Sequence, residues 1–169
     1  MKLELKHLLT YPNAKCQLFG ISELFAFEDY YDEEKFRDGS VWTFAGYADK
    51  DLCIPLGEGE ISYLFRSGST YISVSLNHAK LILRPLFDIT KEIEVGGERF
   101  VPIKEFMILY GGGTTEKGKP IFESDFVANI MYSYYGSLSY SVMEKLFEWH
   151  FDVFGLIEQG LAIDINTLE

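Results

Sequence analysis

The chain has 169 residues, a length typical of one domain and sufficient for a hydrophobic core to stabilise the fold alone. Apolar residues make up 47% of the chain and charged residues 24%, a balance that excludes general disorder. The net charge of −11 predicts repulsion from phosphate backbones, so we expect no direct non-specific nucleic-acid binding.

The N-terminal half has the pattern of short antiparallel strands. Alternation of apolar and polar residues predicts a strand over 70–76, and a second one over 61–66 precedes it across a short turn. Apolar, β-branched and aromatic content predicts further strands at 16–19, 24–27, 41–47 and 80–84. Pro85 ends the last of these, and a short helix is predicted over 86–93.

A small hairpin is predicted near 93–101. Gly96 and Gly97 supply the positive φ values that a two-residue turn requires. In this register Glu94 faces Arg99, an opposite-charge pair, and Ile93 faces Phe100, an apolar pair.

The C-terminal third is predicted to be helical. A shorter helix is expected over 122–133, and Ser141 and Glu144 have the spacing of a capping box that begins a second helix. Apolar residues at helical spacing continue this second helix to Gly160: Val142, Leu146, Trp149, Val153 and Leu156. The fold class is therefore α+β, and residues 1–169 are expected to form a single globular domain.

A glycine-rich segment at 110–120 is predicted to be a mobile loop. Within it, Gly113–Lys119 matches the spacing of a phosphate-binding loop, and 106–110 before it looks like a strand. The next residue is Pro120, which lacks the hydroxyl that would bind Mg²⁺. A nucleotide-binding protein or enzyme that uses this loop is an alternative hypothesis.

The sequence gives no catalytic, cofactor-binding or metal-binding residue. His7, His78 and His150 are scattered, Cys16 and Cys53 lack partners at ligand spacing, and no nucleophile motif is present. His150 falls on the apolar stripe of the predicted helix, which favours a hydrogen-bonded core or boundary histidine. We therefore expect a protein that is not an enzyme and has no cofactor.

Two acidic features are candidate interaction sites. The first is a run of five acids around two tyrosines: Glu28, Asp29, Tyr30, Tyr31, Asp32, Glu33 and Glu34. The second is formed by Glu144, Glu148 and Asp152, which recur every four residues and would share one helix face. Each is either a solvated surface or a docking surface for a protein partner that has a basic surface.

The chain shows no targeting or membrane signal. Lys2, Glu4 and Lys6 interrupt any apolar stretch near the N-terminus of the kind that a secretory signal would need. The longest uncharged run, 126–143, is rich in serine and tyrosine and is therefore a poor match to a membrane span. We expect a cytoplasmic protein with no membrane association.

Two stretches carry a resemblance to a known group. Leu83–Ile93, followed by Gly97–Ile103, is the first, and Leu146–Asp164 is the second. Together they resemble uncharacterised proteins carried by prophages and mobile elements of Bacteroidetes. The resemblance implies a phage or prophage origin, hence the cytoplasm of a bacterial host, and it transfers no catalytic residue.

These observations favour a non-enzymatic phage-type protein that acts by protein–protein binding. The resemblance makes an inhibitor of host defence, similar to an anti-CRISPR protein, the most specific form of this hypothesis. A structural or assembly component of the phage particle is a second alternative, in which the many aromatic residues would form subunit contacts. The oligomeric state stays open.

Overall fold

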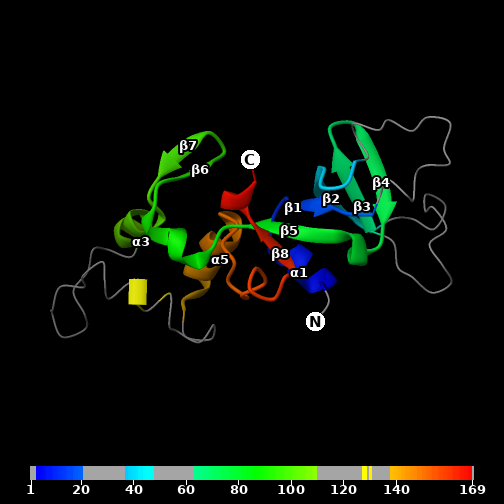
Figure 1. Ribbon diagram of the computed structural model, residues 1–169. Helices are drawn as coiled ribbons and strands as arrows, with labels where there is room; N and C mark the ends of the chain where they lie inside the picture. Colours follow the sequence, from blue (N-terminus) through cyan, green and yellow to red (C-terminus); the bar gives the residue numbers. More distant parts are fainter. Residues whose placement is uncertain are drawn as a thin grey trace, which may run out of the picture. The chain divides into compact units, whose positions relative to one another are not determined.

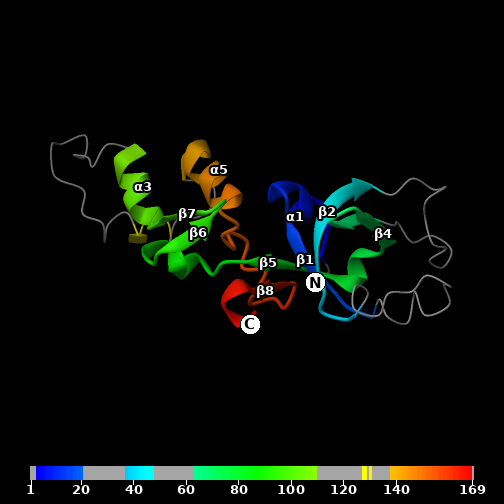
Figure 2. The same ribbon diagram turned by 90° about the horizontal axis from the view of Figure 1, so that it is seen from above.

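The computed structural model describes residues 3–20, 37–47, 63–109, 127–128, 130 and 138–168 (Figures 1 and 2). The chain forms two compact units. The sheet unit comprises Met1–Leu83 with Gly155–Glu169, and the hairpin unit comprises Arg84–Phe154. The prediction of a single domain over 1–169 stays a prediction.

The sheet unit is built on a six-stranded mixed sheet in the order β4-β3-β2-β1-β5-β8 (Figure 1). Neighbouring strands are antiparallel except β5 and β8, which are parallel. The strands are β1 (Lys15–Leu18), β2 (Val41–Tyr47), β3 (Tyr63–Ser67), β4 (Thr70–Val74), β5 (Ala79–Leu83) and β8 (Ala162–Asp164). A 3₁₀ turn, η2 (Leu76–His78), lies before β5. The antiparallel strands predicted in the N-terminal half are confirmed for these segments.

The hairpin of β3 and β4 forms where the sequence predicted it. Ser67 pairs with Thr70, so the turn consists of two residues, and Gly68 has a φ of +59°. A residue that has a side chain rarely adopts this left-handed backbone conformation, whereas glycine adopts it without a steric cost. The turn therefore favours a glycine at this position.

One face of the sheet carries the apolar core of the unit. Cys16 pairs with Trp42 on one side and with Leu81 on the other, and all three side chains are fully buried or nearly so. Side chains alternate between faces along a strand, so Lys15 and Gln17 lie on the opposite face. Burial raises the pKa of the Cys16 thiol to about 12.

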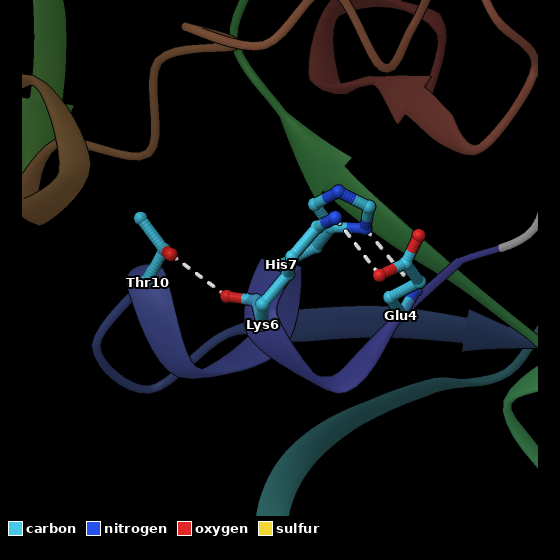
Figure 3. Close-up of polar contacts among 4 residues, drawn as sticks. All are labelled: Glu4, Lys6, His7 and Thr10. Atoms are coloured by element: carbon cyan, nitrogen blue, oxygen red, sulfur yellow. Dashed lines mark hydrogen bonds and ion pairs between the residues drawn. The ribbon is translucent and has the colours of Figure 1, made fainter.

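A short helix, α1 (Leu5–Thr10), precedes β1 and contributes the buried Leu8. Glu4 and His7 form a capping box at its start, in which the backbone N–H of Glu4 donates to Nδ1 of His7 at 3.1 Å (Figure 3). At its end, the Thr10 hydroxyl donates to the carbonyl of Lys6 at 2.7 Å. The helix is thus tied at both ends by its own side chains.

Among its described residues the hairpin unit contains the helices α3 and α5, a few helical residues at 127–128 and 130, a two-stranded hairpin and a 3₁₀ turn (Figure 2). In chain order the labelled elements are η3 (Leu86–Thr90), β6 (Ile93–Val95), β7 (Glu98–Phe100), α3 (Pro102–Leu109) and α5 (Tyr140–Glu148). Their buried side chains form one core: Ile89, Ile93, Ile103, Phe106, Ile130, Val142, Leu146, Trp149, Phe151 and Val153. The predicted hairpin register is confirmed, since Glu94 pairs with Arg99 and Ile93 with Phe100.

The prediction that 106–110 is strand-like is wrong, because Pro102–Leu109 is the helix α3. Proline is favoured at the first position of a helix, where its missing N–H is not needed. The carbonyl of Val101 accepts from the backbone N–H groups of Lys104 and Glu105, which begins the helix. Ile103 and Phe106 then lie on its buried face.

The C-terminal third is not clearly helical, contrary to the prediction. Its only clearly described helix, α5, ends at Glu148, and turns, β8 and the 3₁₀ turn η4 (Ile165–Thr167) follow. The backbone beyond α5 is bonded elsewhere: Arg84 donates to the carbonyl of His150 and accepts from the N–H of Asp152, both at 2.8 Å. This bridge removes the backbone groups that a continuing helix would use.

Several predictions lie outside the described residues. These are the strand at 24–27, the acidic run at 28–34, the loop at 110–120 and nearly all of the helix at 122–133. Within the described ranges, no helix is long and apolar enough to cross a membrane.

Candidate interaction surface

A groove of about 740 Å³ opens in the hairpin unit between the hairpin and α5. Its lining consists of Val95, Gly96, Glu98, Arg99, Phe100, Glu105, Lys145, Glu148 and Trp149. We call it the hairpin groove. It brings together both strands of the hairpin, the first turn of α3 and the end of α5.

Aromatic rings form the base of the hairpin groove. The ring of Trp149 lies 5.0 Å from the ring of Phe100 and 5.0 Å from the ring of Phe106, measured between centroids. Trp149 is only 7% exposed, which fixes its orientation. Tilted rings at this spacing attract each other beyond the area that they bury. The groove therefore has a rigid apolar base.

One cation already lies against this base. Nζ of Lys145 is 5.9 Å from the centre of the Trp149 ring and 2.6 Å from a carboxylate oxygen of Glu148. A positive group over an indole face is attracted by the negative charge of the π system. The groove thus already holds the cation of Lys145 between an aromatic ring and a carboxylate.

The remaining charges of the hairpin groove do not balance. Arg99 forms an ion pair with Glu94, in which Nε of Arg99 lies 3.0 Å from a carboxylate oxygen of Glu94. Glu98 and Glu105 form no ion pair with any residue in the described ranges. Two carboxylates that are not ion-paired within the described part of the chain therefore lie beside the aromatic base.

The structure separates the three acids that were predicted to share a helix face. Glu148 lines the hairpin groove, and Glu144 is exposed on α5 outside the groove lining. Asp152 lies beyond the end of α5 and is only 7% exposed. The predicted shared face is wrong for Asp152, because the backbone leaves the helix before reaching it. The acidic run Glu28–Glu34 lies outside the described residues.

Sequence reasoning missed most of the groove. Glu105 was missed because α3 was not predicted, although Pro102 is a signal for a helix start. The contact between Phe100 and Trp149 joins residues far apart in the sequence, and spacing alone cannot show it. The register of Arg99 and Phe100 in the hairpin was predicted correctly, but no sequence pattern indicated that they line a groove with α5.

Two of the histidines contact backbone groups through Nδ1. Nδ1 of His78 lies 2.9 Å from the carbonyl oxygen of Phe19, and Nδ1 of His7 is an acceptor in the capping box. The described part of the chain contains no group of three or more His, Cys, Asp or Glu side chains that could hold a metal ion.

Comparisons with known proteins give no match. No family model matches the chain, and neither a curated protein nor a solved structure matches it. The role of the hairpin groove is therefore inferred from its own residues.

Proposed function

We propose that the protein acts by protein–protein binding without catalysis, and that the hairpin groove receives a basic side chain of a partner protein. The observation that supports this most directly is the pair of carboxylates, Glu98 and Glu105, which lie beside the Phe100–Trp149 base and form no ion pair with a described residue. An arginine can stack on an aromatic ring and bond to a carboxylate at the same time. Aromatic and charged anchors of this kind dominate binding energies at protein interfaces.

We also propose that the protein originates from a phage or prophage and interferes with host defence in the manner of an anti-CRISPR protein. This rests on the resemblance carried by Leu83–Ile93, Gly97–Ile103 and Leu146–Asp164. The test is phage challenge of a CRISPR-immune host that expresses the chain. Restored plaque formation by the wild type, and its loss in a Glu98→Gln/Glu105→Gln variant, is the expected result. Unchanged immunity with the wild type would contradict it.

The groove itself is tested with Trp149 as a fluorescent reporter. The chain has two tryptophans, so a Trp42→Phe background leaves Trp149 as the only one. An arginine-rich peptide should change its emission in a saturable way, and added salt should weaken binding because exposed charges are screened. A peptide with citrulline in place of arginine keeps the shape without the charge and serves as the control ligand.

Matched variants separate the groove from the general negative charge of the chain. Glu98→Gln/Glu105→Gln should weaken the binding of the arginine peptide about tenfold, which corresponds to about 1.4 kcal/mol. Glu144→Gln/Glu158→Gln removes the same charge from exposed sites outside the groove and should change binding little. Equal loss in both variants would overturn the assignment of the groove. Saturable binding of ATP or GTP that Lys119→Ala abolishes would favour the nucleotide-binding alternative.

A further inference from the structure

The face of the sheet opposite the core carries an ordered set of cations. Strand pairing places Lys15, Thr43, Arg66 and Tyr71 in one row across four strands. A second row consists of Val41, Gln17 and Lys80. Directly paired residues of antiparallel strands point to the same side of a sheet. We call these seven residues the open sheet face.

The charge of the open sheet face is opposite to that of the whole chain. Lys15, Arg66 and Lys80 are exposed, and no acidic residue occupies any of the seven positions. None of the three forms an ion pair within the described ranges. Since the chain has 26 acids and 15 bases, three neighbouring cations without an acid are a local reversal of charge.

A groove continues the open sheet face at the start of β2. It has a volume of about 850 Å³ and shares Gln17 and Val41 with the face. Among the described residues that line it, Arg37 is the only charged one. The other lining residues are Gly39, Ser40, Trp42, Ser67, Ile163, Thr167 and Leu168. The basic face therefore extends into a concave site that an extended chain can enter.

Aromatic side chains flank the cations. Tyr71 is 54% exposed and pairs directly with Arg66, while Nζ of Lys80 lies 5.9 Å from the centre of the Phe19 ring. The cations span four neighbouring strands, which at about 4.8 Å per strand covers roughly 15 Å. A site of this width matches acids at alternate positions of an extended segment, which are about 7 Å apart.

We propose that the open sheet face binds a short, extended acidic segment of a partner protein. The positive charge selects the acids, and Tyr71 and Val41 provide apolar contacts between them. A protein segment fits better than a nucleic acid, because a polyanion longer than the basic face would be repelled by the rest of a chain whose net charge is −11. The inference rests on the proposed function only in that the protein acts by binding; it concerns another surface and the opposite charge.

Peptide titration tests this proposal. The probe is a fluorescent ten-residue peptide in which glutamate alternates with valine, and its glutamine counterpart is the control ligand. Only the glutamate peptide should bind, and its affinity should fall as salt is added. Arg66→Gln/Lys80→Gln should weaken its binding about tenfold. Lys6→Gln/Lys104→Gln makes the same change in net charge at exposed cations off this face and should have little effect.

The outcomes separate this proposal from the proposed function. Absence of saturable binding, or equal loss in both double variants, would overturn the open sheet face as a docking site. Tight binding of an oligothymidine probe that depends on Arg66 and Lys80, without binding of the glutamate peptide, would make the face a nucleic-acid site instead. Glu98→Gln/Glu105→Gln should leave the glutamate peptide bound, whereas it weakens the arginine peptide at the hairpin groove. Thermal melts of all variants should show that they remain folded.

Discussion

The backbone N–H of Phe151 donates to the carbonyl of Leu146, five residues earlier, at 2.9 Å. The backbone N–H of His150, which lies between them, donates to the carbonyl of Phe147 at 3.0 Å, and His150 has a φ of +59°. These two bonds form the Schellman motif that ends α5. Leu146 and Phe151, the two residues joined by the first bond, are both buried in the same apolar core. Histidine thus occupies a position at which glycine is usual.

Replacement of His150 by glycine should stabilise the protein relative to replacement by alanine. Both variants lose the imidazole, but only alanine keeps the steric cost of the left-handed conformation, which is about 1–2 kcal/mol. Chemical denaturation should therefore give a larger free energy of unfolding for His150→Gly than for His150→Ala. Equal values would contradict the left-handed backbone at this residue.

Trp149→Ala should destabilise the protein by about 3–5 kcal/mol, because it removes a large buried side chain from between Phe100 and Phe106. Trp149→Phe keeps an aromatic ring and should cost much less. The free energy of unfolding of each variant can be measured in urea. If Trp149→Ala has no effect on stability, the aromatic base of the hairpin groove is not formed in solution.

Stability should fall as the pH drops below the ordinary histidine pKa of 6.5, in part because of His7. Burial, with a smaller contribution from Lys6, lowers the pKa of His7. The unfolded chain therefore takes up a proton at a higher pH than the folded chain, so acid favours unfolding. Protonation also places a hydrogen on Nδ1, which accepts the N–H of Glu4.

The contribution of His7 can be isolated with His7→Asn, which keeps a hydrogen-bond acceptor near the position of Nδ1 but does not titrate. Melting temperatures of the wild type should fall more steeply than those of His7→Asn between about pH 7 and about pH 5. Parallel pH profiles for the two proteins would show that the environment of His7 does not affect its protonation.

Cys16 should be inert toward thiol reagents in the folded protein. Its pKa is raised to about 12 by burial, so almost no thiolate forms at mildly alkaline pH, and the sulfur is also inaccessible. In a Cys53→Ser variant, in which Cys16 is the only thiol, reaction with a chromogenic disulfide should occur only after denaturant is added. Rapid reaction of the native variant would show that β1 opens readily.

Local patterns predicted the hairpins, whereas the chain beyond α5 also bonds to a residue that is distant in the sequence. The Gly96-Gly97 turn and its paired residues lie within a few positions of each other, so the sequence contained the whole register. The helix was predicted to continue to Gly160 because Val153 and Leu156 keep the helical period. At the actual stop, the Schellman motif is joined by Arg84, which bonds to the backbone on both sides of Phe151. No pattern around residue 150 shows this partner.

The open sheet face was hidden in the sequence for a similar reason. Lys15, Arg66 and Lys80 come from three strands, and only the pairing order β3-β2-β1-β5 brings them to one side. Net charge averages over the whole chain and therefore conceals a local basic surface. The alternation of residues in β4 did predict which side of the strand carries Tyr71. It could not show that β2 lies beside β3, the strand that pairs with β4.

Because β5 pairs with β8, the sheet can be completed only after a late part of the chain has been synthesised. β5 leaves the ribosome long before β8, because the whole hairpin unit lies between them in the sequence. Until Ala162–Asp164 emerge, one side of β5 has unpaired backbone groups that another strand can occupy. A polypeptide that stops before these residues is therefore expected to aggregate, and the nascent chain needs protection at this edge until β8 has been synthesised.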